Sequence, residues 1–108
     1  MRKVVKFGGS SLASAEQFKK VGDIIRADKG RKYVVPSAPG KRFDGDIKVT
    51  DMLYACYAKA EKKEDITASI AAIRERYMEI INGLGLSLSL DDQFEVISEN
   101  FKKLAGSN

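Results

Sequence analysis

The first 30 residues show two hydrophobic periods, one typical of a strand and one typical of a helix. Residues 3–7, KVVKF, form a valine-rich run closed by residues 8–9, Gly-Gly, which predicts a short strand followed by a tight turn. Ser14 and Gln17 form a capping box, and the apolar positions after them recur at helical spacing. These features predict a helix over about residues 15–28.

A second valine-rich run follows this helix. Residues 32–36, KYVVP, predict a buried strand that ends at Pro36. Strand, helix and strand in this order indicate a βαβ unit, in which the two strands are parallel and the crossover is right-handed. The next stretch, residues 39–49, is rich in proline, glycine and charge, so we expect a mobile, solvated loop.

The rest of the chain has the period of amphipathic helices. We expect a second helix capped by Thr50, a long third helix stopped by Gly83, and a fourth helix that opens at Ser89 and runs to Gly106. Such apolar stripes are typical of core or interhelical packing. Their members are Leu53, Tyr54, Tyr57, Ile66, Ile70, Ile73, Tyr77, Ile80, Ile81, Phe94, Ile97, Phe101 and Leu104.

Two strands and four helices make an incomplete α/β pattern. A parallel sheet usually has more than two strands and is covered by helices on both faces. The pattern therefore predicts an α/β fold that is the start of a parallel-sheet α/β/α sandwich, truncated before the sheet is complete and carrying several amphipathic helices.

Composition narrows the chemistry that this chain can perform. The 108 residues contain no histidine and one cysteine, Cys56, which we expect to be a small buried hydrophobe. This excludes Ser-His-Asp triads, histidine metal sites, an internal disulfide and a thiolate zinc cluster. We expect no signal peptide, because Lys6 and Gly8 interrupt the first apolar run. We also expect no membrane span, and we expect a cytoplasmic protein.

The net charge of +4 is unevenly distributed along the chain. Residues 1–50 hold 12 Lys and Arg against 5 Asp and Glu, whereas residues 51–108 hold 7 against 10. A basic half is typical of proteins that bind phosphate, nucleotide or nucleic acid. Charge alone favours the simpler interpretation, a solvated basic surface.

The segment with the most chemical information is residues 6–13, KFGGSSLA, between the first strand and the first helix. Ligands of open α/β sheets bind at the carboxyl ends of the strands, and paired glycines let the backbone approach a phosphate. Lys6 can reach a transferring phosphate oxygen, while Ser10 and Ser11 add hydroxyl donors. The spacing matches neither a Walker A loop nor GxGxxG, so an ordinary tight turn explains it equally well.

The loop after the second strand, residues 37–42, SAPGKR, adds a second set of donors. Adjacent parallel strands place both loops at one sheet edge, where Lys6, Lys41 and Arg42 would converge on an anion pocket. For Lys41 and Arg42 we favour the alternative, a flexible exposed loop. Thr50 is either a helix cap or a substrate contact at the start of that helix.

Three motifs in order resemble the start of one known family. KFGGSSLA, then VVPSAPGKR after one helix, then TDMLYACY are similar to aspartate kinase, a branch of the amino-acid kinase superfamily, in register to about residue 60 and more loosely thereafter. The resemblance implies an amino-acid kinase-like fold. It also implies that ATP, with Mg²⁺, phosphorylates L-aspartate to 4-phospho-L-aspartate at the start of lysine, threonine and methionine synthesis.

The resemblance also assigns roles to single residues. It implies that Lys6 is the catalytic lysine that contacts the transferred phosphate, that Ser37 lies near the phosphoryl-transfer site, and that Thr50 helps bind aspartate. It implies phosphate-loop positions at Gly8, Gly9 and Ser10. The β-carboxylate of aspartate, with an ordinary pKa of ~3.9, is already ionised, so the reaction needs charge neutralisation and no general base. No metal ligand from the chain itself is expected.

The chain departs from the family pattern at several places. Ser10 stands where threonine is common, Pro36 stands where an aliphatic residue is usual, and the stretch from Lys41 to Val49 is longer than in many relatives. The resemblance implies an N-terminal fragment of an amino-acid kinase domain, spanning 1–108. In it, 1–60 supply βαβ-type substrate and phosphate loops, and 61–108 form a helical segment. The nucleotide-base half and the regulatory ACT domains are expected to be absent, so the isolated chain is expected to be inactive.

Other functions remain open at this point. One is a different superfamily member, such as an acetylglutamate, glutamate or uridylate kinase. Another is a small basic module that binds anions or nucleic acid, although its aromatic residues are not interleaved with basic ones. A third is an assembly piece whose helices at 66–81 and 94–104 bury their apolar faces against another copy or a missing partner. We expect L-aspartate as substrate, no nucleic acid and no membrane as partners, and a homo-oligomer formed through exposed helical faces.

Overall fold

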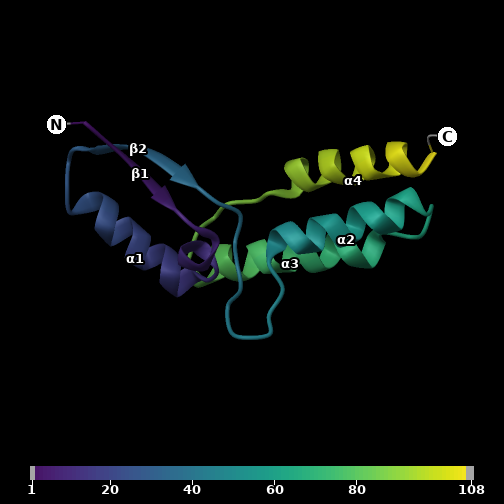
Figure 1. Cartoon of the computed structure of the whole chain (residues 1–108), viewed down its shortest axis with the longest axis horizontal. Helices are drawn as coiled ribbons and strands as arrows, with labels where there is room; N and C mark the ends of the chain where they lie inside the picture. The colour runs from purple at the N-terminus through teal and green to yellow at the C-terminus, as the bar shows by residue number, and fades with distance from the viewer. Residues whose placement is uncertain (1, 107–108) are drawn as a thin grey trace.

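A computed structural model describes residues 2–106 of the chain. In order, the elements are β1 (Lys3–Phe7), the 3₁₀ helix η1 (Gly9–Leu12), α1 (Ala15–Arg26), β2 (Arg31–Pro36), α2 (Val49–Glu61), α3 (Thr67–Gly83) and α4 (Asp91–Gly106). The molecule is elongated, at 52 × 29 × 26 Å. The strands and α1 occupy one end, and α2, α3 and α4 pack together at the other (Figure 1). These elements confirm the predicted α/β class with several helices.

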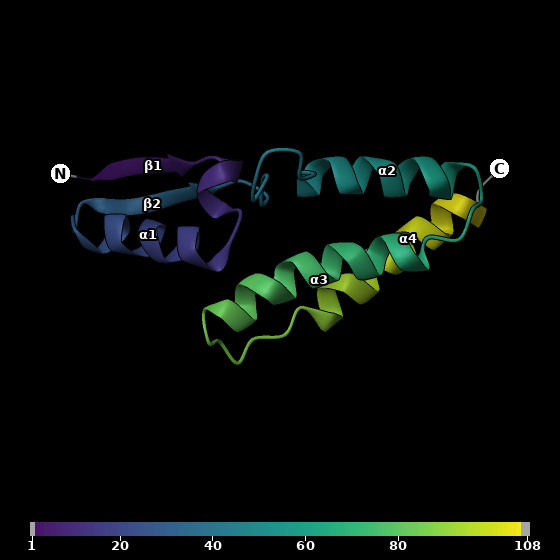
Figure 2. The same ribbon diagram turned by 90° about the horizontal axis from the view of Figure 1, so that it is seen from below.

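The two strands are parallel and adjacent, as the strand–helix–strand order predicts. Their register places Lys6 opposite Val35 and Phe7 opposite Pro36. Helix α1 runs along one face of the sheet, as Figure 2 shows, because its apolar stripe packs against the strand side chains on that face. The cluster consists of Phe7, Leu12 and Val21, with Val5, Phe18 and Ile25 packed around them.

The opposite face of the sheet is exposed. Side chains alternate along a strand, so Val4 and Lys6 of β1 share this face with Tyr33 and Val35 of β2. Val4 is 71% exposed and Tyr33 is 51% exposed. The prediction of a buried second strand is therefore wrong, because α1 covers only one face and nothing else among residues 2–106 covers the other.

The helical end has its own core, made from the predicted apolar stripes. Val49, Ile73 and Phe94 form one cluster that joins α2, α3 and α4, and the ring of Tyr77 meets that of Phe94 edge-on at 5.9 Å. A second cluster contains Cys56, which is fully buried as expected, and burial raises the pKa of its thiol. The stripes of α3 and α4 are thus confirmed as packing surfaces, whereas Tyr54 and Tyr57 of the α2 stripe are exposed.

Two helix ends follow the predictions, and the start of a third lies two residues later than expected. The hydroxyl of Ser14 accepts a hydrogen bond from the Gln17 amide at 3.4 Å, although α1 ends at Arg26, two residues earlier than expected. Helix α3 ends at Gly83, as predicted. Helix α4 begins at Asp91, two residues after Ser89, and the hydroxyl of Ser89 accepts a hydrogen bond from the Asp91 amide. None of the helices in the described part of the chain is both long and apolar enough to cross a bilayer.

The start of α2 differs from the prediction. Lys48, not Thr50, occupies the N-cap, and Thr50 lies within the first helical turn. The amide of Val49 donates to the carbonyl of Pro39 at 3.0 Å, so a backbone carbonyl satisfies this amide in place of a capping hydroxyl. The stretch 39–49, expected to be a solvated loop, is buried at both ends, at Pro39, Gly40 and Val49.

Candidate anion-binding site

An open pocket of about 500 Å³ lies where the two strands end. Three segments line it: residues 9–10 directly after β1 (the first loop), residues 37–41 of the stretch 37–47 between β2 and α2 (the second loop), and residues 48–51 at the start of α2. We call it the loop pocket, and its lining residues are Gly9, Ser10, Ser37, Ala38, Pro39, Gly40, Lys41, Lys48, Thr50 and Asp51. The structure thus brings together the two loops that the parallel strands predict at one sheet edge.

The two loops touch through their backbones. The Gly40 amide donates to the Gly9 carbonyl at 2.8 Å, and the Ser37 amide donates to the Phe7 carbonyl at 3.1 Å. A Cβ atom added at Gly40 would lie 2.6 Å from the carbonyl carbon of Gly9 and 2.9 Å from the Ser10 nitrogen. Both neighbouring atoms are backbone, so only glycine allows this approach.

The charged groups around the loop pocket are mainly positive and therefore favour an anionic ligand. Lys41 and Lys48 contribute two ammonium groups against the single carboxylate of Asp51. The first turn of α2, a helix of 13 residues, also lines the pocket and places the positive end of the helix dipole there. Hydroxyl donors come from Ser10, Ser37 and Thr50, and such a set suits a phosphate or carboxylate.

Two residues expected at this site lie outside the pocket lining. Lys6 is exposed on the uncovered face of the sheet, opposite Val35 in the register. Gly8 is exposed at the N-cap of η1, in an extended conformation. The structure therefore gathers Gly9, Ser10, Ser37 and Thr50 in the loop pocket and places Lys6 and Gly8 just before the first loop.

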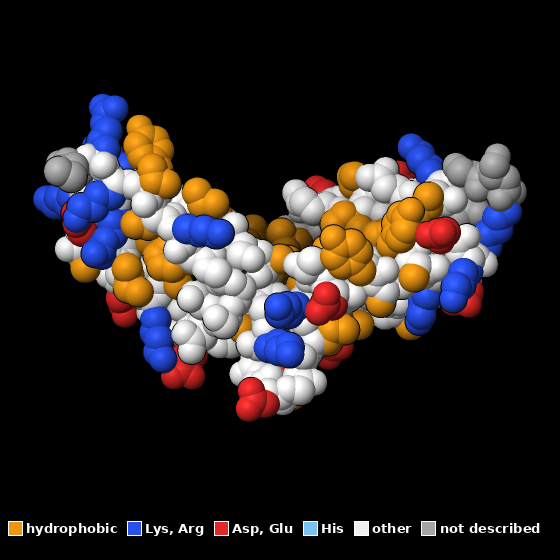
Figure 3. Space-filling model, viewed as in Figure 1, with side chains coloured by type: hydrophobic (Ala, Val, Ile, Leu, Met, Phe, Trp, Pro, Cys, Tyr) orange, Lys and Arg blue, Asp and Glu red, His pale blue; other side chains and the backbone are white. Residues whose placement is uncertain are grey.

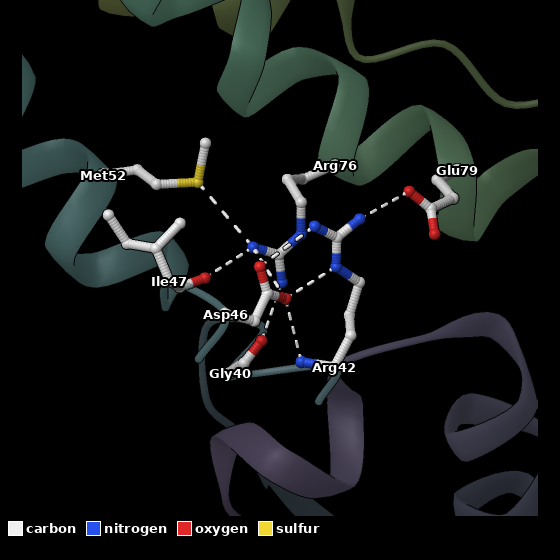
Figure 4. A network of polar contacts seen from close by, with 7 residues as sticks. All are labelled: Gly40, Arg42, Asp46, Ile47, Met52, Arg76 and Glu79. Atoms are coloured by element: carbon white, nitrogen blue, oxygen red, sulfur yellow. Dashed lines mark hydrogen bonds and ion pairs between the residues drawn. The ribbon is translucent and has the colours of Figure 1, made fainter. Parts of the chain in front are cut away.

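Arg42 does not converge on the pocket, and it is not a freely exposed side chain either. Its Nε donates to an Asp46 carboxylate oxygen at 2.7 Å, and its Nη1 donates to Glu79 of α3 at 2.8 Å (Figure 4). The hydrogen bond from the Arg42 side chain holds the pKa of Asp46 well below its usual range, and the same contact raises the pKa of Arg42. Arg42 thus ties the second loop to α3.

Arg76 of α3 is a residue that the sequence pattern did not identify. Its side chain is 5% exposed, and its guanidinium donates to the carbonyls of Gly40 and Ile47, each at 2.7 Å (Figure 4). The available signal was its position between Ile73 and Ile80, on the apolar stripe of the helix. A cation on a buried stripe indicates a buried polar partner.

The sequence profile of the amino acid kinase family matches residues 1–101. The chain belongs to the amino acid kinase family. This confirms the resemblance described above, and the match covers both loops, α1, α2, α3 and most of α4.

Aspartokinases are among the similar proteins of this family. Aspartokinase 3 of Bacillus subtilis (strain 168) is 46% identical over 100 residues, covering 88% of this chain and 22% of the relative. Aspartokinase of Chlamydia muridarum (strain MoPn / Nigg) is 33% identical over 89 residues, covering 82% of this chain and 18% of the relative. The chain therefore spans about a fifth of the length of these relatives.

A solved structure agrees with the sequence comparisons. The crystal structure of Clostridium acetobutylicum aspartate kinase superposes with a TM-score of 0.88 at 43% identity, covering 93% of this chain and 23% of that one. This likeness confirms that the fold is part of the amino-acid kinase fold.

Sequence reasoning also missed two charged residues of the pocket, Lys48 and Asp51. Their position in the sequence could have identified them, because they flank Thr50, which the resemblance already implied to bind substrate. Among residues 2–106, no group of three or more carboxylate or cysteine side chains could hold a metal ion, and Asp51 is the carboxylate that the pocket offers.

Proposed function

We propose that the chain forms the N-terminal part of an aspartate kinase, in which the loop pocket receives phosphates of ATP and carboxylates of L-aspartate. The observation that carries this proposal is the convergence of two glycine-containing loops and a helix start on one pocket, in a chain 46% identical to an aspartokinase over 100 residues. In this view residues 1–60 supply the loops and residues 61–108 support them. The nucleotide-base half and the ACT domains of the family would lie outside residues 1–108.

Each expected site residue has a role in this proposal. Lys6 stabilises the charge on the phosphoryl group being transferred, from its place at the carboxyl end of β1. Ser37 and Thr50, which both line the pocket, donate hydroxyl hydrogen bonds to L-aspartate. The phosphate contacts are assigned to Gly8, Gly9 and Ser10.

The transfer itself needs no proton acceptor from the chain. A β-carboxylate oxygen of aspartate forms a bond to the γ-phosphorus, and the bond from that phosphorus to the leaving oxygen of ADP breaks. The carboxylate is ionised near pH 7, so a site without histidine suffices. Mg²⁺ would arrive with ATP and neutralise phosphate charge, because it usually keeps several waters and is held largely by the phosphates of its substrate.

The proposal extends to the setting of the protein. We place it in the cytoplasm, as a homo-oligomer formed through exposed helical faces. Figure 3 shows hydrophobic side chains gathered over α2 and α4, and Tyr54 is 69% exposed there. Tyr54 and Tyr57 line an open apolar pocket of about 430 Å³ together with Phe101, a surface suited to contact with a second copy.

A nuclear magnetic resonance titration tests the proposed ligands. Adding Mg-ATP to the ¹⁵N-labelled chain should shift the amide signals of Gly9, Ser10 and Ser37, and adding L-aspartate should shift those near Thr50. Lys6→Ala should weaken ATP binding, whereas Lys20→Ala, an exposed lysine on α1, should not. Unchanged spectra with both ligands would contradict the proposal.

Turnover and selectivity are tested separately. A coupled assay of ADP release with L-aspartate should show no turnover for residues 1–108, because the matched region covers only about a fifth of the aspartokinase relatives. Turnover that Lys6→Ala abolishes would show that the chain is active alone. Signals that shift with glutamate, acetylglutamate or uridylate, and not with aspartate, would favour another member of the family.

A further inference from the structure

We propose that Arg76 is a positioning residue that sets the spacing of the two glycine loops and thereby the shape of the loop pocket. Arg76 lies outside the pocket, behind the wall formed by the second loop, so it acts through the backbone and not on the ligand. The part of this proposal that concerns ligand binding rests on the proposed function.

A continuous chain of short hydrogen bonds runs from α3 to the first loop. Arg76 Nη2 donates to the Gly40 carbonyl at 2.7 Å, and the Gly40 amide donates to the Gly9 carbonyl at 2.8 Å. Gly40 therefore transmits the position of the guanidinium directly to the residue that begins η1. Any movement of the Gly40 carbonyl moves the backbone that Gly9 and Ser10 contact.

A second contact holds the other end of the same loop. Arg76 Nη1 donates to the Ile47 carbonyl at 2.7 Å, directly before the N-cap of α2. One planar guanidinium therefore fixes Gly40 and Ile47, the residues on either side of the excursion that contains Arg42 and Asp46 (Figure 4). The ammonium of lysine lacks this rigid fork of donors, so arginine is specifically suited to joining two carbonyls.

Other groups around Arg76 make weaker contacts than the carbonyls of Gly40 and Ile47. Its Nη1 lies 3.8 Å from an Asp46 carboxylate oxygen, which supplies a counter-charge, and 3.8 Å from the Met52 sulfur. Its buried Nε has no hydrogen-bond partner among residues 2–106. The guanidinium therefore makes its short hydrogen bonds to the loop backbone, through both Nη atoms.

Amide hydrogen exchange of the intact 108-residue chain tests the positioning role. The variants are Arg76→Met, which removes both donors, and Arg76→Lys, which reaches one carbonyl. The control is Arg74→Met, because Arg74 lies on the same helix with an exposed side chain paired to Asp91. In Arg76→Met we expect the Gly40 amide to exchange at least tenfold faster, with the Cys56 amide of the α2 core unchanged.

Arg76→Lys should give an intermediate exchange rate at Gly40, and Arg74→Met should match the unsubstituted chain. Parallel acceleration at Gly40 and Cys56 would mean that Arg76 only stabilises the helices, and an unchanged Gly40 rate would mean that it does not hold the loop; either result overturns the proposal. If Arg76→Met does not fold, the lysine variant decides by the same comparison.

The affinity for Mg-ATP, measured by titration of the same samples, tests the ligand-binding part. We expect the dissociation constant of Arg76→Met to rise at least tenfold and that of Arg74→Met to stay the same. Faster exchange at Gly40 with unchanged affinity would overturn the link between loop spacing and binding. If the unsubstituted chain binds no ATP, the proposed function fails, and the exchange rates still decide whether Arg76 holds the loops.

Discussion

At the scale of single residues, Gly40 carries the tightest steric constraint of the loop pocket. Gly40→Ala would place a methyl group 2.6 Å from the Gly9 carbonyl carbon, so the two loops must separate. We expect the free energy of unfolding to fall by about 1–3 kcal/mol, the usual cost of overpacking. Urea denaturation measures this change. Gly8→Ala is the control, because a Cβ at Gly8 meets nothing within 4 Å, and equal losses for both variants would contradict the steric argument.

Asp46 gives a prediction about pH. The hydrogen bonds from Arg42 lower the pKa of Asp46 in the folded state, so its stabilising contribution is fully present above the unfolded pKa of ~3.9. It is lost as the pH falls below that value towards the folded pKa. Asp46→Asn should therefore lower stability at pH 7, and the difference from the unsubstituted chain should shrink in acid.

Urea denaturation of both proteins at a series of pH values measures this difference. Asp44→Asn is the matched control, since Asp44 is exposed in the same loop. A gap between Asp46→Asn and the unsubstituted chain that stays constant down to pH ~2 would contradict the assignment of the low pKa to Asp46.

The candidate site was partly predictable at this scale. The positions of Gly9, Ser10 and Ser37 follow from where they stand after the two strands, because parallel strands bring their following loops to one edge. Arg42 and Arg76 were not predictable in the same way. Their partners are carboxylates and carbonyls that only the packing of α3 against the second loop brings within reach.

At the scale of elements, the helical core depends on contacts that cross from helix to helix. Ile73 is 2% exposed and packs with Val49 of α2 and Phe94 of α4. Ile73→Ala should lower the free energy of unfolding by roughly 2–5 kcal/mol, because it removes buried methyl groups and leaves a cavity. Denaturant unfolding measures the loss. Ile24→Ala, at a site that is 46% exposed on α1, should lose much less, and a comparable loss there would contradict this account of the core.

The hydrophobic periodicity predicted where the elements lie in the sequence, but not which of their faces other elements cover. The helices at 67–83 and 91–106 follow the apolar spacing because each one buries a stripe against the others. The exposure of β2 was not predictable, since the run of Tyr33 to Val35 shows only that a strand can be buried. Whether it is buried depends on which element covers it, and α1 reaches only one face.

At the scale of the whole molecule, exposed apolar side chains lie at both ends of an elongated chain. If α2 and α4 form the contact with a second copy, the sedimentation coefficient should rise with protein concentration. Tyr54→Ser should then return the chain to a monomer, because it removes an aromatic side chain from the contact surface. Val4→Ser on the uncovered sheet face is the control, and dissociation by Val4→Ser alone would assign the contact to the sheet.

The touching backbones of Gly9 and Gly40 also bear on how related sequences diverge. The amide of one residue holds the carbonyl of the other, and a side chain at position 40 has no room while the loops keep this spacing. The two positions are therefore constrained as a pair, although they lie on opposite sides of α1 in the sequence. In a relative with a larger residue at position 40, the first loop must lie farther from the second. The residue at this one position therefore indicates how wide the pocket is in each relative.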